Sequence, residues 1–550
     1  MLPKAPRIKS QWLLLFISLY LTAFLNIPFF KHIYGYVWEL ESINYLFVVS
    51  LPVFLCCAIY VFLSPFVIKG LTKPLLAMIL ILSAMASYAT LSYGTIFDPS
   101  MIQNFVETDA AEASGYLSLS AATNLLIFGI IPAALLLWIK IDYRPFIKEV
   151  AYRLLYVAIA LTIFAGVTFG LYQDYAGVAR NNAQVQKLIV PGEFITSIVR
   201  YAANNLFVTN QQFADLGTDA HEIKTATDLP RLTVVVLGET ARAANYHFNG
   251  YPRDTNPYTS KLNILALHNV TSCGTSTAIS VPCMFSFLQH SNFDKSNALY
   301  QSNVLDVLTE AGIQVTWIDN SSGCKDVCVR VPTKLTDKTD PGGLCDGEHC
   351  YDEVLLSYLD QALATASPDH DQVIVLHLIG SHGPTYYLRY PDQFKTFTPD
   401  CPRSDIQNCT QEQIINSYDN TIRYTDYVLS LLVQYLNQDA QYESALVYMS
   451  DHGESLGEGG IYLHGMPYSF APEEQIKVPG LVWLSPKFLA DQPMDDQCLN
   501  GLANQPLSHD YLSHTLLGLM SVQTSTYNPQ LDLFAGCRKS IQGMLTTAHR

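Results

Sequence analysis

Five long apolar runs occupy the first third of this 550-residue chain and constrain its fold more than any other feature. They cover residues 11–30, 44–64, 74–94, 121–139 and 153–172. A helix of about 20 residues, rising about 1.5 Å per residue, crosses a hydrocarbon layer about 30 Å thick. Buried helices of a soluble protein are the alternative, but no run carries a charge near its centre. We therefore predict five transmembrane helices and a membrane module over residues 1–172.

The charged residues indicate that the two parts of the chain face different surroundings. Only 15% of the residues are charged, whereas about 25% is usual for soluble chains. Residues 1–172 contain 10 Lys and Arg and 8 Asp and Glu, a net charge of +2. Residues 173–550 contain 22 Lys and Arg and 40 Asp and Glu, a net charge of −18. A disordered chain would be more charged, and a nucleic-acid binder would usually be basic, so we expect neither.

Positive charges that flank the apolar runs predict the orientation in the membrane. Nine of them collect on one side: Lys4, Arg7, Lys9, Lys69, Lys73, Lys140, Arg144, Lys148 and Arg153. The loops on the opposite side, residues 31–43 and 95–120, contain only Lys31. Because cytoplasmic loops carry an excess of Lys and Arg, we predict a cytoplasmic N-terminus and an external location for everything after residue 172.

The cysteines support an oxidising location for the second part of the chain. Cys56 and Cys57 lie inside a span, where we expect packing residues. The other ten are external, as is typical of disulfides, and we predict these pairs: Cys273–Cys283, Cys324–Cys328, Cys345–Cys350, Cys401–Cys409 and Cys498–Cys537. The sequence alone does not fix the pairing. Zinc binding by the four thiolates between residues 324 and 350 is the alternative.

Residues 173–229 form a polar connection to the external part of the chain. Apolar residues recur in it at helical spacing: Phe194, Ile195, Ile198, Val199 and Tyr201. Such a helix could lie on the membrane surface or act as a linker packed on the following domain. Both interpretations remain open.

From residue 230 to 550 the pattern is typical of strands that alternate with helices. Continuous apolar runs at 232–237, 373–378 and 445–449 indicate strands buried on both faces. Helical stretches at 351–365 and 411–437 lie between them. We predict an α/β/α domain with a mainly parallel sheet, whose ligands bind beyond the carboxyl ends of the strands.

Polar side chains follow each of these three predicted strands. Glu239 follows the first, His382 the second, and Asp451 with His452 the third. Singly, these residues could be helix caps, first-turn acids or surface residues. Together, carboxylate and imidazole groups at neighbouring strand ends favour a zinc site.

Three hydroxyl residues, Thr275, Ser276 and Thr277, precede a predicted helix start. Ser and Thr in this position are ordinary helix caps. A metal beside one hydroxyl would lower its pKa and make it a nucleophile, and the helix N-terminus could receive a phosphate. The predicted Cys273–Cys283 disulfide would stiffen this loop.

These motifs resemble those of the alkaline-phosphatase/sulfatase superfamily. Nearly the whole chain resembles the lipid A phosphoethanolamine transferases of Gram-negative inner membranes, which include the colistin-resistance enzymes. The segments that carry the resemblance are Val236–Arg242, Cys273–Ser286, Gly380–Pro384, Ser450–Ser455 and Leu463–Gly465.

The resemblance implies a metal site and a nucleophile. Glu239, Thr277, Asp451 and His452 would bind the main zinc ion, and Thr277 would be the nucleophile. Residues 289–292 read Gln-His-Ser-Asn, where related enzymes carry a carboxylate near the site. This departure leaves a second zinc ion uncertain, so one is expected.

The resemblance also implies residues that contact the substrate. His382 and His464 would lie on the phosphate side, where they bind substrate, move protons or hold a second zinc ion, and Lys325 would contact the substrate. Three residues spaced four apart match those that hold the ethanolamine head group: Asn104, Thr108 and Glu112. On one exposed helix that spacing is also simply a polar face. His377 is predicted to point into the sheet and to be structural.

The implied reaction transfers phosphoethanolamine from phosphatidylethanolamine to a lipid A phosphate through a covalent Thr277 intermediate. It would give polymyxin resistance, and we expect a monomer in contact with membrane lipids. A membrane-tethered phosphohydrolase, or a transferase acting on another envelope glycan, remains open. A sulfatase is disfavoured because Ser280–Met284 has Met where that family needs Arg. A non-enzymatic sensor would be expected to lack the nucleophile or a ligand.

Overall fold

A computed structural model describes residues 5–38, 43–108, 110–181, 183–206, 212–223, 229–339, 342–367 and 369–539. The chain forms two compact units. We call the first, Met1–Ile102 with Leu117–Ala203, the helical unit, and the second, Gln103–Tyr116 with Asn204–Arg550, the α/β unit. The structure thus groups a segment of the predicted membrane module with the α/β unit.

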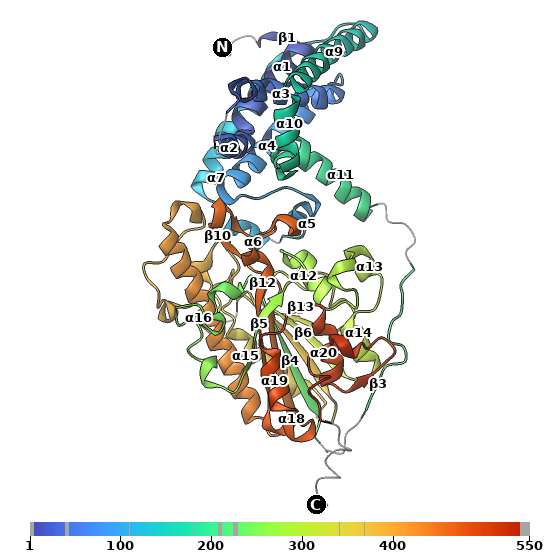
Figure 1. Ribbon diagram of the computed structural model, residues 1–550, viewed down its shortest axis with the longest axis vertical. Helices are drawn as coiled ribbons and strands as arrows, with labels where there is room; N and C mark the ends of the chain where they lie inside the picture. The colour runs from blue at the N-terminus through green and yellow to red at the C-terminus, as the bar shows by residue number, and fades with distance from the viewer. Residues whose placement is uncertain are drawn as a thin grey trace, which may run out of the picture. The chain divides into compact units, whose positions relative to one another are not determined.

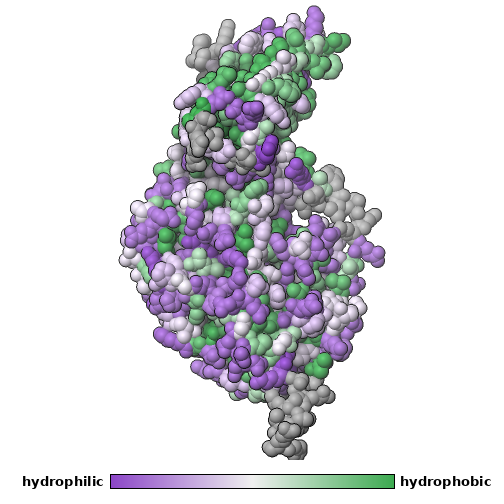
Figure 2. All heavy atoms as spheres, viewed as in Figure 1, coloured by the Kyte–Doolittle hydropathy of each residue, from purple (hydrophilic) through white to green (hydrophobic). Residues whose placement is uncertain are grey.

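The helical unit contains four apolar helices that match four of the predicted spans. They are Tyr45–Phe66 (α3 Tyr45–Leu63 with η2 Ser64–Phe66), α4 Thr72–Tyr93, Leu119–Trp138 (α7 Leu119–Asn124, η3 Leu125–Ile130, α8 Ile131–Trp138) and α9 Phe146–Gly170. Each has 20 to 25 residues. Large apolar side chains such as Trp12, Phe16 and Leu154 are exposed on this unit, and hydrophobic residues are prominent on its visible surface, interspersed with hydrophilic ones (Figure 2).

The first apolar run is not the single helix predicted for residues 11–30. Helix α1 (Ser10–Tyr20) continues as η1 (Leu21–Leu25), and α2 (Ile27–Trp38) then follows at a bend of 58°. At the bend, the Asn26 amide donates to the Val190 carbonyl at 2.8 Å and accepts from the Val190 N–H at 3.0 Å. Pro28 also removes a backbone donor just after the bend. The described residues of the unit therefore include four helices long and apolar enough to cross a membrane, or five if the bent pair is one span.

The described residues from 172 to 206, which begin the predicted polar connection, are largely helical and belong almost entirely to the helical unit. Their elements are α10 (Tyr172–Asn181), η4 (Ala183–Leu188) and α11 (Gly192–Leu206). Phe194 is buried in the core of the helical unit and Ile195 packs against it, whereas Val199 is 63% exposed. Helix α11 thus packs on the helical unit by one side and leaves apolar side chains uncovered on another.

The α/β unit is built on an eight-stranded sheet of order β13-β5-β12-β9-β4-β8-β6-β7 (Figure 1). The strands are β4 Arg231–Gly238, β5 Leu265–Thr271, β6 Gln314–Asp319, β7 Thr333–Leu335, β8 Gln372–His377, β9 Glu443–Ser450, β12 Lys477–Leu484 and β13 Leu507–Ser508. Only β12 runs antiparallel to its neighbours. The mainly parallel sheet is confirmed, and the three predicted strands are β4, β8 and β9 at its centre.

Helices cover both faces of this sheet, with α15 and α16 on one side and α14 and α20 on the other (Figure 1). The helices of the unit that matter below are α12 Thr277–Met284, α13 Lys295–Leu299, α14 Val304–Glu310, α15 Val354–Thr365, α16 Gln411–Gln438 and α20 Tyr511–Leu519. Val235 and Leu237 of β4 pack in one core with Leu305 and Leu516. Side chains alternate along a strand, so the equally buried Val236 faces the other helices.

Ten cysteines form five disulfides in the α/β unit. The pairs are those predicted: Cys273–Cys283, Cys324–Cys328, Cys345–Cys350, Cys401–Cys409 and Cys498–Cys537. Zinc binding by the thiolates between residues 324 and 350 is therefore wrong. Cys56 and Cys57 of α3 are unpaired.

Candidate metal centre and nucleophile

The register of the central strands brings the predicted site residues together. Gly238, the last residue of β4, pairs with Ser450, the last residue of β9, so Glu239 and Asp451 leave the sheet side by side. Leu237 pairs with His377 at the end of β8 in the same way. The site thus forms at the carboxyl edge of a parallel sheet, where loops diverge and leave room for a ligand.

Four of the predicted residues make a compact buried cluster. Glu239, Asp451 and His452 each offer a ligand atom, and these atoms lie within 4.8 Å of one another. His452 Nε2 is 3.4 Å from Glu239 Oε1 and 3.3 Å from Asp451 Oδ2. Thr277, the first residue of α12, donates its hydroxyl to Glu239 Oε2 at 3.1 Å and lies 3.3 Å from His452 Nε2.

The hydrogen bonds of Asp451 show that this cluster suits a cation. Its Oδ1 accepts from the backbone N–H groups of Thr240, at 3.1 Å, and His452, at 2.7 Å. Its Oδ2 is buried and accepts no hydrogen bond from the described residues. A buried carboxylate oxygen without a partner is costly, and a metal ion would satisfy it.

His452 is oriented in the manner of a metal-bound imidazole. Its Nδ1 lies 2.9 Å from the Gly453 carbonyl and donates its proton there, which leaves the Nε2 lone pair directed at the carboxylates. A Cβ on Gly453 would lie 2.0 Å from the Glu474 carbonyl oxygen, so only glycine fits. Two carboxylates, an imidazole and a hydroxyl form a donor set that fits zinc.

The electrostatics of the cluster also favour a cation. Burial, followed by the charge of Glu239, raises the pKa of Asp451 to about 8. Burial, followed by the charge of His464, lowers the pKa of His452 to about 4, so its imidazole is neutral near pH 7. Burial would raise the pKa of Glu239, but the adjacent His377 and the other histidines around the cluster hold it well below its ordinary value.

His377, predicted to be structural, is fully buried but also contacts the cluster. Its Nδ1 lies 2.9 Å from Asp319 Oδ2, and its Nε2 lies 3.8 Å from Glu239 Oε2. Burial would lower its pKa, but the adjacent Asp319 and Glu239 raise the pKa to about 10. Trp317 donates to the same Asp319 oxygen at 2.8 Å. The prediction therefore missed the contact between His377 and Glu239.

His382 and His464 lie together beside the cluster. The ring centroids of His464 and His452 are 4.4 Å apart, and those of His464 and His382 are 5.5 Å apart. His464 Nδ1 is 2.9 Å from Glu454 Oε2, and Tyr386 donates to the other oxygen of that carboxylate. Glu454 is fully buried. Glu454 is not among the predicted site residues, although it follows His452 by only two residues.

The remaining predicted substrate residues lie in two separate segments. Lys325 sits in the Cys324–Cys328 loop, and its ammonium group donates to the Ser322 carbonyl at 3.0 Å. The Thr108 hydroxyl donates to the Asn104 carbonyl at 2.7 Å. Thr108 falls between α5 (Pro99–Glu107) and α6 (Ala110–Gly115), so the three residues do not share one helix face. The side chain of Glu112 lies outside the described part of the structure.

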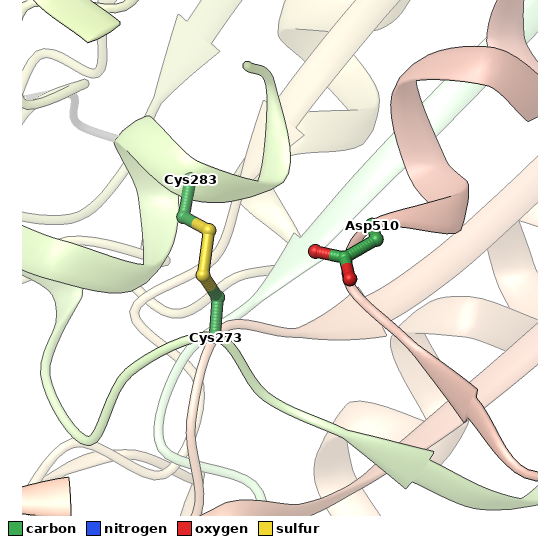
Figure 3. A group of neighbouring side chains, drawn as sticks. All are labelled: Cys273, Cys283 and Asp510. Carbon is green, nitrogen blue, oxygen red and sulfur yellow. A yellow bond between two sulfur atoms is a disulfide. The ribbon is translucent and has the colours of Figure 1, made fainter. Parts of the chain in front are cut away.

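A second group of candidate ligand atoms does not fit a metal. It comprises Cys273, Cys283 and Asp510 (Figure 3). The two sulfur atoms are bonded to each other, so neither can act as a thiolate ligand. His290, in the segment that lacks the expected carboxylate, has its Nδ1 2.9 Å from the Cys273 carbonyl.

Comparison with known proteins gives consistent matches for both units. Residues 231–522 match the sulfatase family, and residues 55–206 match the family described as phosphoethanolamine transferase EptA/EptB. EptA of Salmonella typhimurium is 41% identical over 96% of this chain and 97% of its own length. The phosphatidylethanolamine transferase Mcr-1 of Escherichia coli is 35% identical over 92% and 94%.

A solved structure agrees with these matches. The integral membrane lipooligosaccharide phosphoethanolamine transferase EptA of Neisseria meningitidis has a TM-score of 0.94 and 37% identity. The match covers 97% of this chain and all of that structure. The chain is therefore a membrane enzyme that belongs to the EptA family of phosphoethanolamine transferases.

Proposed function

We propose that this enzyme transfers phosphoethanolamine from phosphatidylethanolamine to a phosphate group of lipid A, with Thr277 as the covalent nucleophile. The observation that carries this proposal is the position of the Thr277 hydroxyl, between Glu239 Oε2 and His452 Nε2. The donor is supported by the name of Mcr-1, a phosphatidylethanolamine transferase. The acceptor is supported by the lipooligosaccharide acceptor of the meningococcal relative.

Glu239, Thr277, Asp451 and His452 would hold one zinc ion. Bound zinc would lower the pKa of the Thr277 hydroxyl and offset negative charge on the phosphoryl oxygens. The chain itself fixes the geometry, because Asp451 is held by two backbone N–H groups and His452 by the Gly453 carbonyl.

The reaction would be a double displacement. In the first half, the Thr277 hydroxyl gives up its proton and Oγ1 forms a bond to the phosphorus of the donor, the bond to the diacylglycerol oxygen breaks, and that oxygen takes up a proton. In the second half, a lipid A phosphate oxygen forms a bond to the same phosphorus, the Thr277 Oγ1–phosphorus bond breaks, and Oγ1 takes up a proton again. Both halves conserve phosphoethanolamine and consume no water.

The His382 and His464 pair would supply and recover the proton. His464 presents its Nδ1 to the Glu454 carboxylate at 2.9 Å, which fixes the tautomer that donates there and makes Nε2 the nitrogen that can accept a proton. His382 lies beside it, with ring centroids 5.5 Å apart. Lys325 would add positive charge near the phosphate.

We also propose that the enzyme resides in the bacterial inner membrane with a cytoplasmic N-terminus and an α/β unit in the periplasm. Positive charge at the ends of the predicted spans supports this orientation, and five disulfides support an oxidising compartment. Added ethanolamine would place ammonium groups on lipid A phosphates. The modified lipid A would attract cationic polymyxin less strongly, and resistance to polymyxin would follow.

Mass spectrometry of envelope lipids from cells that express the enzyme tests the proposal directly. We expect lipid A to gain the mass of one phosphoethanolamine, and the gain to disappear with Thr277→Ala. The same mass gain on another glycan would show that this glycan, and not lipid A, is the acceptor. Release of free phosphoethanolamine without any lipid product would show a hydrolase instead.

The donor head group is proposed to contact Asn104, Thr108 and Glu112, in a segment that belongs to the α/β unit. The contacts of this segment with the rest of that unit include an ion pair and a close approach at Gly115. Glu107 Oε1 lies 2.7 Å from Lys295 Nζ of α13, and a Cβ on Gly115 would lie 3.8 Å from the Thr385 side chain. Helix α13 packs on α12, which begins with Thr277, and Thr385 follows His382 by three residues. Both contacts are thus made beside the candidate site.

Breaking the Glu107–Lys295 ion pair is expected to weaken donor binding. Both side chains are partly buried: 25% of the Glu107 side chain and 13% of the Lys295 side chain are exposed. We expect an ion pair in this position to contribute about 1 kcal/mol to donor binding, so its loss should raise KM about 5-fold. Glu107→Lys or Lys295→Glu should raise KM for phosphatidylethanolamine, and the doubly exchanged variant should recover. An additive loss in the double variant would argue against this role.

A further inference from the structure

His509 connects the loop that carries Thr277 to the strand that carries Asp451. This residue follows β13 and is fully buried. The Cys273 N–H donates to its Nδ1 at 3.1 Å, and its Nε2 donates to the Ser450 carbonyl at 2.9 Å. Both nitrogens are therefore engaged with backbone groups, one on each side of the site.

The two strands that end near these backbone groups are not hydrogen-bonded to each other in the sheet. Cys273 follows β5 and Ser450 ends β9, and β12 lies between these two strands in the sheet. The backbone N–H of His509 also donates to the Thr271 carbonyl of β5 at 3.1 Å. The imidazole thus spans from one strand end to another that is not its neighbour.

These contacts require one neutral tautomer. Nδ1 must accept a proton and Nε2 must carry one, which excludes the doubly protonated ring. Burial lowers the pKa of His509 to about 3, consistent with a neutral ring. The ring is therefore neutral near pH 7, as both contacts require.

Neighbouring residues attach the same segment to α12. The Asp510 carboxylate accepts from the His290 N–H at 2.8 Å and lies beside the Cys273–Cys283 disulfide (Figure 3). The Ser513 hydroxyl donates to the Met284 carbonyl, at the last residue of α12, at 3.0 Å. Residues 509–513 therefore contact both the loop before Thr277 and the far end of its helix.

We propose that His509 is a positioning residue that holds the Thr277 loop in register with Asp451 and His452. Cys273 precedes Thr277 by four residues, and Ser450 directly precedes Asp451. Without the link, the nucleophile and the ligands on β9 could shift independently of each other. Loss of partners that orient a metal site typically costs about 10- to 100-fold in activity or metal affinity. This inference rests on the proposed role of Thr277.

Three substitutions of His509 in the full-length enzyme separate its two contacts. His509→Leu removes both. His509→Asn places an amide oxygen where Nδ1 was and so retains the acceptor for Cys273. His509→Gln can place its amide N–H near the Ser450 carbonyl and retain that contact. We expect kcat with phosphatidylethanolamine in detergent micelles to fall about 10- to 100-fold in His509→Leu and less in the other two, with KM within about 3-fold of the original.

His514→Gln is the matched control. His514 is also a buried histidine of this segment, and its Nδ1 accepts from the Asn528 backbone N–H at 3.1 Å. Its loss should lower Tm as much as loss of His509 while leaving kcat unchanged. Hydrogen exchange without substrate gives an independent readout, because the Cys273 amide should exchange faster in His509→Leu and His509→Gln but not in His509→Asn or His514→Gln.

Normal kcat in all three His509 variants, or an equal loss of kcat in His514→Gln at matched Tm, would overturn the proposal. If His509→Leu fails to fold, His509→Asn and His509→Gln still decide the question. Absence of a Thr277 adduct in the original enzyme would instead overturn the proposed function. In that case, faster exchange at Cys273 would still show that His509 holds the loop.

Discussion

Replacing Thr277 with alanine is expected to lower the rate of phosphoethanolamine transfer by a factor on the order of 10³ to 10⁶, the loss seen when a covalent nucleophile is removed. In the proposed mechanism the hydroxyl oxygen of Thr277 forms the bond to phosphorus, and the methyl group of alanine cannot replace it. Incubation with phosphatidylethanolamine, followed by digestion and mass spectrometry, should show phosphoethanolamine on the peptide that contains Thr277 in the original enzyme and no modified peptide in the variant.

Ser276→Ala provides the matched control for this experiment. Ser276 is the N-cap of α12, yet its side chain makes no capping hydrogen bond. Its loss should leave transfer within about 3-fold of the original rate, since no cap is lost. Full activity of Thr277→Ala, or an adduct that moves to another residue, would exclude Thr277 as the nucleophile.

Replacing Asp451 with asparagine is expected to abolish zinc binding while stabilising the metal-free protein. The variant loses a charged ligand, so zinc content and transfer should fall by about 100-fold or more. It also removes a buried carboxylate that repels Glu239, and the asparagine oxygen can still accept from Thr240 and His452. With zinc removed by a chelator, the variant should melt about 2 °C or more above the original.

The pH dependence of this stabilisation has a defined sign. In the metal-free protein, burial and the charge of Glu239 raise the pKa of Asp451 to about 8, whereas an unfolded aspartate titrates at about 3.9. The folded state therefore binds more protons between these values, and its stability falls as pH rises through them. The variant's advantage in Tm should thus be larger at pH 8 than at pH 5. An equal or reversed difference would contradict the proposed charge repulsion.

Most of the fold could be predicted because its signals are local. The apolar runs that became α3, α4 and α9 contain few charges, and the β-branched run at 232–237 became the central strand β4. The bend at Asn26 could not be predicted, because it depends on two hydrogen bonds to Val190, 164 residues away.

In the candidate site too, residues with a local sequence signal could be predicted, and residues defined by distant contacts could not. Glu239, Asp451 and His452 could be found because each directly follows an apolar strand, and parallel strands bring such positions to one edge. His509 could not be found in this way, since its partners Cys273 and Ser450 are 236 and 59 residues away and are backbone groups that any sequence offers.

The grouping of Gln103–Tyr116 with the α/β unit has a consequence for fragments of the enzyme. The chain passes between the two units at residues 102/103, 116/117 and 203/204, so the α/β unit is not one continuous stretch of sequence. A fragment that starts after residue 203 would retain the proposed metal ligands and nucleophile, yet it would lack a piece of its own compact unit.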